Sequence, residues 1–114
     1  MEPLYTISES SHDGLVRLAL EGEFDLSGAP TITDRVRAHL TADTTAGIVI
    51  DLSAVTFLDS SGINALLESR RLATESGRAF RASGARGPVA QVLDLTGVAD
   101  YLAATPPTPD GEAP

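Results

Sequence analysis

The feature that most restricts the fold of this chain is the apolar run Ile-Val-Ile-Asp-Leu at residues 48–52. Its apolar residues are mostly β-branched and do not alternate with polar ones, which is typical of a strand covered on both faces in a parallel sheet. Apolar residues at helical spacing before and after the run, in residues 29–40 and 63–67, predict that helices connect this strand to its neighbours.

The rest of the chain extends this pattern. Residues 4–9 and 15–25 predict two strands, and Asp13-Gly14 between them is a hairpin turn signal. After the apolar run, residues 60–77 predict a helix, residues 78–83 a weak strand and residues 87–97 a third helix. The order β-β-α-β-α-β-α predicts an α/β (mixed α+β) domain. Its small mixed sheet has an N-terminal hairpin, parallel central strands and helices packed on it.

The expected domain is residues 4–103. The remaining residues, 104–114, are rich in proline and polar residues, which predicts a disordered tail.

Composition and charge narrow the function classes. The net charge is −8 and every basic residue is an arginine, so nucleic acid and anionic membrane surfaces are poor partners. The absence of cysteine excludes disulfides and thiolate metal sites, and the two histidines lie far apart in the sequence, so no metal site and no cofactor are expected. No apolar run approaches the ~20 residues of a membrane span, and no signal peptide is evident. A cytoplasmic protein with a protein partner is expected.

Asp-Ser-Ser-Gly at residues 59–62 stands where the central strand passes into a helix, and three interpretations are open. Asp59 or Ser60 is a helix cap, which requires nothing further. Alternatively Ser60 is a nucleophile, but neither His12 nor His39 is evidently placed as its base. In the third interpretation Ser60 accepts a phosphate, which would add about −1.5 to −2 charges at the helix start. Ser27 is the expected cap of the preceding helix.

Three blocks carry a family resemblance: "GEFDLSGAPTI", "VIDLSAVTFLDSSGINALL" and "VAQVLDLTGV". Their order and spacing resemble the STAS domain of bacterial anti-sigma factor antagonists over about residues 4–103. The resemblance implies a mixed sheet flanked by helices. One departure is that the chain after Gly97 runs into the proline-rich segment, where many members of the family continue into a further helix.

The resemblance also implies a function. Such proteins bind an anti-sigma factor with serine kinase activity and so free a sigma factor; the kinase phosphorylates the first serine of the motif, and a PP2C-type phosphatase reverses this. Carried onto this chain, the phosphorylated residue is Ser60. The implied partner contacts are Asp25, Ser27, Asp59, Ser61, Gly62 and Ile63.

Two other functions remain open from the sequence. One is a STAS scaffold module of a stressosome-like or transporter-associated complex. The other is an enzyme, against which stands the lack of a phosphate-binding Gly-x-x-x-x-Gly-Lys-[Ser/Thr] loop and of any Cys/His/acid cluster.

Overall fold

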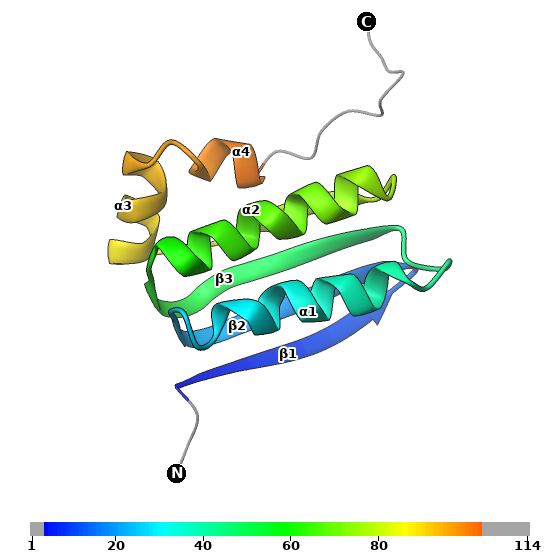
Figure 1. The fold of residues 1–114 in the computed structure, drawn as a ribbon, viewed down its shortest axis with the longest axis horizontal. Coiled ribbons are helices and arrows are strands. Elements are labelled where there is room, and N and C mark those ends of the chain that lie inside the picture. The colour runs from blue at the N-terminus through cyan, green and yellow to red at the C-terminus, as the bar shows by residue number, and fades with distance from the viewer. Residues whose placement is uncertain (1–3, 104–114) are drawn as a thin grey trace, which may run out of the picture.

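The computed structural model describes residues 4–103, which form a mixed sheet with helices packed on it (Figure 1). In chain order the elements are β1 (Tyr5–His12), β2 (Leu15–Phe24), α1 (Ala29–Leu40), β3 (Gly47–Leu58), α2 (Ser60–Glu75), β4 (Ala79–Ser83), α3 (Gly87–Leu95) and α4 (Ala99–Ala103). The predicted order of elements is confirmed, with α4 as an addition. The tail predicted at residues 104–114 lies outside the described residues.

The sheet has the strand order β1-β2-β3-β4. The β1–β2 pair is an antiparallel hairpin, and the β2–β3 and β3–β4 pairs are parallel, as predicted. Asp13 and Gly14 both have positive φ, 53° and 85°, which the tight turn of such a hairpin requires at its two central residues. The carboxyl ends of β2 and β3 therefore lie at the same edge of the sheet.

The apolar run of β3 supplies the centre of the core. Ile48, Val49 and Ile50 are all buried, in agreement with a strand covered on both faces. The strand, however, continues to Leu58, and beyond Ile50 its burial follows a mixed pattern with exposed positions. The predicted coverage of both faces therefore holds only for the first part of β3. On β2, alternate residues point into the same core: Val16, Leu18 and Leu20.

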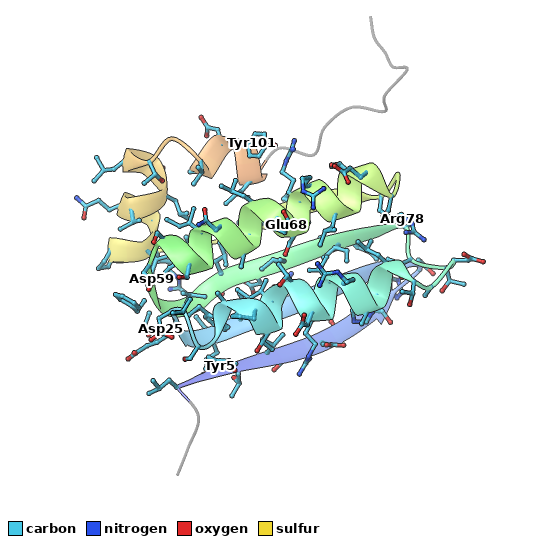
Figure 2. All side chains as sticks on the ribbon, in the orientation of Figure 1. Tyr5, Asp25, Asp59, Glu68, Arg78 and Tyr101 are labelled. Carbon is cyan, nitrogen blue, oxygen red and sulfur yellow. The ribbon has the colours of Figure 1, made fainter. Side chains whose placement is uncertain are left out.

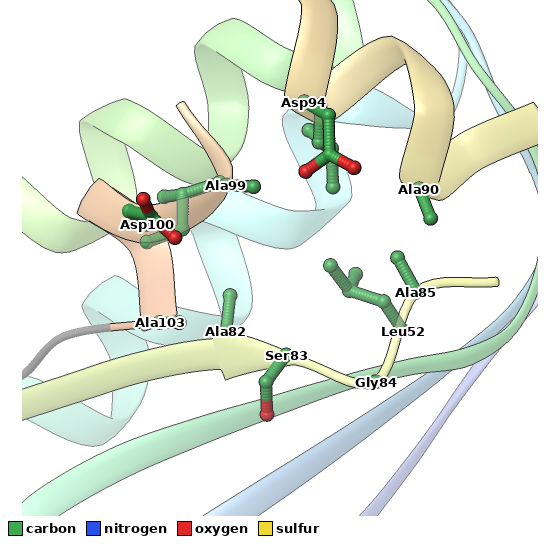
Figure 3. A pocket seen from close by; sticks show the side chains of 12 residues that line it. Leu52, Ala82, Ser83, Gly84, Ala85, Ala90, Asp94, Ala99, Asp100 and Ala103 are labelled. Carbon is green, nitrogen blue, oxygen red and sulfur yellow. The ribbon is translucent and has the colours of Figure 1, made fainter. Parts of the chain in front are cut away.

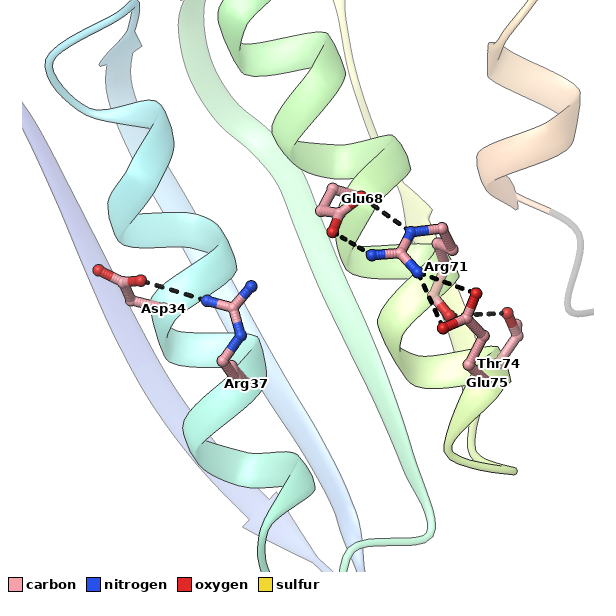
Figure 4. A network of polar contacts seen from close by, with 6 residues as sticks. All are labelled: Asp34, Arg37, Glu68, Arg71, Thr74 and Glu75. Atoms are coloured by element: carbon pink, nitrogen blue, oxygen red, sulfur yellow. Dashed lines mark hydrogen bonds and ion pairs between the residues drawn. The ribbon is translucent and has the colours of Figure 1, made fainter.

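Helices α1 and α2 lie side by side over the sheet (Figure 1). Each buries an apolar stripe and exposes charged residues on the other side. Figure 4 shows the exposed ion pairs: Arg37 lies 3.6 Å from Asp34 on α1, and Arg71 binds both Glu68 and Glu75 on α2. None of these helices, nor any other in residues 4–103, is long and apolar enough to cross a membrane.

Helix α4 was not expected from the sequence, which predicted no helix after Gly97. It forms because Leu102 is buried in the core, and its backbone N–H donates to the Val98 carbonyl at 2.9 Å. The Arg70 guanidinium of α2 also stacks 3.8 Å from the centre of the Tyr101 ring. One buried leucine in a five-residue helix is too short a pattern for periodicity to reveal.

Candidate functional site

The candidate site lies at the carboxyl ends of two neighbouring parallel strands. Phe24 of β2 pairs directly with Leu58 of β3, so the residues that follow them, Asp25 and Asp59, leave the sheet side by side. Figure 2 shows these two acids at the same end of the domain. The sheet register therefore brings together two acidic residues that are far apart in the sequence.

Asp59 is the N-cap of α2. Its backbone is extended, with φ −101° and ψ −169°, and its Oδ1 accepts hydrogen bonds from the backbone N–H groups of Ser61 at 2.9 Å and Gly62 at 3.2 Å. These donors have no partner within the helix, so the carboxylate satisfies them and meets the positive end of the helix dipole. The cap interpretation is confirmed for Asp59 rather than for Ser60.

Ser60, the first residue of α2, is exposed. Its hydroxyl makes no hydrogen bond to any other residue in the part of the chain that the structure describes. Since Asp59 already caps the helix, the Ser60 hydroxyl is free for another purpose.

Replacing Asp59 by alanine should lower the free energy of unfolding by about 1 kcal/mol, because two backbone donors lose their acceptor. Denaturant unfolding followed by circular dichroism measures the change. Asp59→Asn is the matched control, since its side-chain oxygen still accepts at the N-cap and stability should stay near that of the parent chain. An asparagine variant as unstable as the alanine variant would contradict the capping role.

Asp25 organises the loop between β2 and α1. Its Oδ1 accepts from the Ser27 hydroxyl at 2.8 Å and from the Ser27 backbone N–H at 2.9 Å. These hydrogen bonds, the one from the hydroxyl foremost, hold the pKa of the Asp25 carboxyl below its usual value. The Asp25 carboxylate therefore stays charged and fixed in direction at neutral pH.

The expectation that Ser27 caps α1 is wrong. Gly28 occupies the N-cap position, no side chain caps the helix there, and Ser27 instead turns its hydroxyl toward Asp25. The start of α1 is held by backbone groups, because the Asp25 carbonyl accepts from the N–H groups of Gly28 and Ala29 at 3.1 and 2.8 Å. Local hydrogen bonding of Asp and Ser in a turn competes with capping, and here the turn is preferred.

Gly62 and Ile63 lie behind the surface of the site. Both are buried, and a Cβ on Gly62 would stand 2.8 Å from the Phe24 carbonyl oxygen and closer still to the Leu58 side chain. The resemblance implied that Gly62 is a partner contact, whereas in the structure its lack of a side chain lets α2 approach β2 and β3. Of the predicted contact residues, those with surface to offer are Asp25, Ser27, Asp59 and Ser61, and the predicted phosphorylation site Ser60 is exposed beside them.

Two apolar side chains near this corner were missed by the sequence analysis. Leu26, between Asp25 and Ser27, is 76% exposed, and Phe57, shortly before Asp59, is 47% exposed. The signal for Leu26 was available, because it is a leucine flanked by polar turn residues. Phe57 follows a long apolar strand, and nothing in the sequence distinguishes it from a core residue.

Within residues 4–103 neither histidine is placed to act as a general base for Ser60. His12 is in the hairpin, 3.2 Å from Asp13, and His39, near the end of α1, bonds Glu9 of β1 at 2.8 Å. The turn after β1 lies at the end of β2 opposite to the one where Phe24 leads into the site. The nucleophile interpretation therefore lacks the histidine base that would activate the Ser60 hydroxyl. Within residues 4–103 no three His, Asp or Glu side chains are grouped as they would be to hold a metal ion.

Comparison with known proteins decides the family. The family model described as "Mlab, STAS domain" matches residues 7–104. The chain belongs to the STAS domain family. This STAS domain is 33% identical to the anti-sigma-F factor antagonist RsfB of Mycobacterium tuberculosis over 87 residues, which are 74% of this chain and 70% of the relative. The resemblance identified from the three sequence blocks is thereby confirmed.

Solved structures agree with the fold. An anti-sigma factor antagonist from Mycobacterium paratuberculosis is 31% identical and superposes with a TM-score of 0.73, covering 86% of this chain and 82% of that one. SpoIIAA in its unphosphorylated form is 18% identical, with a TM-score of 0.71 and 84% of each chain covered. The predicted STAS fold, a mixed sheet with an N-terminal hairpin and flanking helices, is confirmed.

Proposed function

We propose that this anti-sigma factor antagonist binds an anti-sigma factor with serine kinase activity through the Ser60 corner, and that phosphorylation of Ser60 ends the binding. A PP2C-type phosphatase restores the unmodified serine. The protein acts in the cytoplasm and catalyses no reaction of its own. The similarity to named antagonists supports the class of function, and the geometry of the corner supports the switch.

The observation that carries the proposal is the unoccupied, exposed Ser60 hydroxyl at the start of α2. A kinase can reach an exposed hydroxyl at an element boundary, and the cap supplied by Asp59 keeps the helix formed whether or not Ser60 is modified. If the Ser60 hydroxyl itself capped the helix, its phosphorylation would remove the cap and destabilise α2. Because Asp59 is the cap, phosphorylation of Ser60 leaves the cap in place.

The cap also determines what a phosphate on Ser60 would meet. Helix N-termini bind anions through free N–H groups, but Asp59 already occupies those of Ser61 and Gly62. The phosphate would instead add its charge beside the Asp59 carboxylate and near Asp25, whose carboxyl stays ionised. Because that charge is not neutralised locally, it faces the partner, where a like-charge contact costs several kcal/mol.

The apolar neighbours of the corner support a protein partner. Leu26 and Phe57 are large and exposed on the two segments that border Ser60. Exposed apolar groups clustered near polar residues are typical of protein–protein contact sites. A partner that covers these two side chains and Ser60 would strip water from a phosphate on that residue.

The test is incubation of the protein with candidate anti-sigma kinases and ATP, followed by mass spectrometry of the peptide that contains residues 59–62. We expect one phosphate, on Ser60. Ser61→Ala should be modified as before and Ser60→Ala not at all. A phosphate on Ser61, or no modification by any anti-sigma kinase of the same cell, would overturn the proposal, and the second outcome would favour the scaffold function.

A further inference from the structure

A cavity of about 210 Å³ opens between the end of β4, α3 and α4 (Figure 3). Its apolar lining includes Leu52, Leu93 and Leu102, which are buried, and five alanines. A cavity of ~150 Å³ with apolar walls accommodates a benzene molecule, so this one has room for about six to eight heavy atoms.

Two carboxylates stand at the opening. Asp94 of α3 and Asp100 of α4 line the cavity, and both residues are exposed (Figure 3). Neither side chain has a hydrogen bond or ion pair within residues 4–103, and none of the described lining residues is basic. The cavity thus joins an apolar interior to an uncompensated negative rim.

We propose that this cavity binds a small alkylammonium ion, with the alkyl chain in the apolar interior and the ammonium group at the rim between Asp94 and Asp100. Burial of each methylene contributes about 0.8 kcal/mol, and the cation stays at the surface where it keeps water and two acidic neighbours. A chain of about five carbons fits the volume. None of the described residues that line the cavity belongs to the Ser60 corner.

Because the interior of the cavity is apolar and its charges lie at the rim, a ligand should carry its charge only at the end that stays outside. A lysine side chain that reaches in from a docked protein would enter with its charge first and carry it to the apolar end, which is costly. A diamine has the same difficulty with its second charge. A neutral alcohol of the same length fills the interior but has no attraction to the rim. The structure therefore favours a free monoamine over all three.

The test uses the full ¹⁵N-labelled chain titrated with n-pentylammonium chloride at fixed ionic strength, with the shifts of the Ala82, Ala90 and Ala99 amides as the readout. We expect saturable binding with half-saturation below about 10 mM. Under the same conditions n-pentanol and 1,5-diaminopentane should bind at least tenfold more weakly. Equal affinity for the alcohol would overturn the role of the carboxylates, and equal affinity for the diamine would overturn the proposed orientation.

Two variants locate the site. Asp94→Asn combined with Asp100→Asn should weaken n-pentylammonium binding at least tenfold without loss of fold, because both side chains are exposed. Ala90→Leu should fill the cavity and abolish binding; circular dichroism verifies that the variant is folded. Undiminished binding by the double asparagine variant, or no saturable shift in the parent chain up to about 50 mM, would overturn the proposal.

Discussion

Replacing Gly62 by alanine should lower the free energy of unfolding by about 2–3 kcal/mol, although alanine is the better helix former. The added Cβ would meet the Phe24 carbonyl oxygen at 2.8 Å and lie closer still to the Leu58 side chain. Backbone cannot give way as a flexible side chain can, so α2 must move away from the ends of β2 and β3. Denaturant unfolding measures the loss.

The matched control is Asn64→Ala, in the same turn of α2 but exposed. It should change stability by no more than about 0.5 kcal/mol, as surface substitutions do. The two variants together separate close packing from helix propensity. A Gly62→Ala protein as stable as the control would show that α2 does not depend on this close approach, and the position of Ser60 would then need another explanation.

The second large effect concerns binding. Ser60→Asp should weaken binding to the anti-sigma partner about 100-fold, which corresponds to about 2.7 kcal/mol, whereas Ser60→Ala should bind as the parent chain does. The aspartate adds a charge beside Asp59 at an exposed position where the Ser61 and Gly62 donors are already taken. Isothermal titration calorimetry with the purified partner measures both affinities.

Ser60→Asn separates charge from size. Asparagine has nearly the shape of aspartate but no charge, so its affinity should remain within about threefold of the parent. Equal weakening by asparagine and aspartate would mean that the corner excludes bulk rather than charge. The electrostatic account would then be wrong even if Ser60 is phosphorylated.

Much of the fold could be predicted because its signals are local and strong. Asp13-Gly14 has the residues that a tight hairpin turn needs, and the run at residues 48–52 has no polar alternation, so both were placed correctly. The adjacency of Asp25 and Asp59 is a consequence of the parallel pairing, since parallel neighbours end at the same edge of a sheet. The length of β3 did not follow, because its second half is only partly buried.

The details that the sequence missed are choices between competing local contacts. The Ser27 hydroxyl can either cap α1 or donate a hydrogen bond to Asp25. The conformation of the loop determines that it donates to Asp25. From the sequence, Gly62 could equally be a partner contact or a position where two elements pack closely. In the structure Phe24 and Leu58 lie so close to Gly62 that close packing is its role. The exposure of Phe57 likewise depends on where α3 lies, which the sequence does not specify.

The central claim is that a phosphate on Ser60 switches off binding to the partner. The most direct measurement compares the affinities of the unmodified and the Ser60-phosphorylated protein for the same anti-sigma kinase, before and after treatment with a PP2C-type phosphatase. We expect binding to fall more than 100-fold on phosphorylation, beyond the effect of a single aspartate charge, and to recover fully when the phosphate is removed. Equal affinity of the two forms would contradict the account.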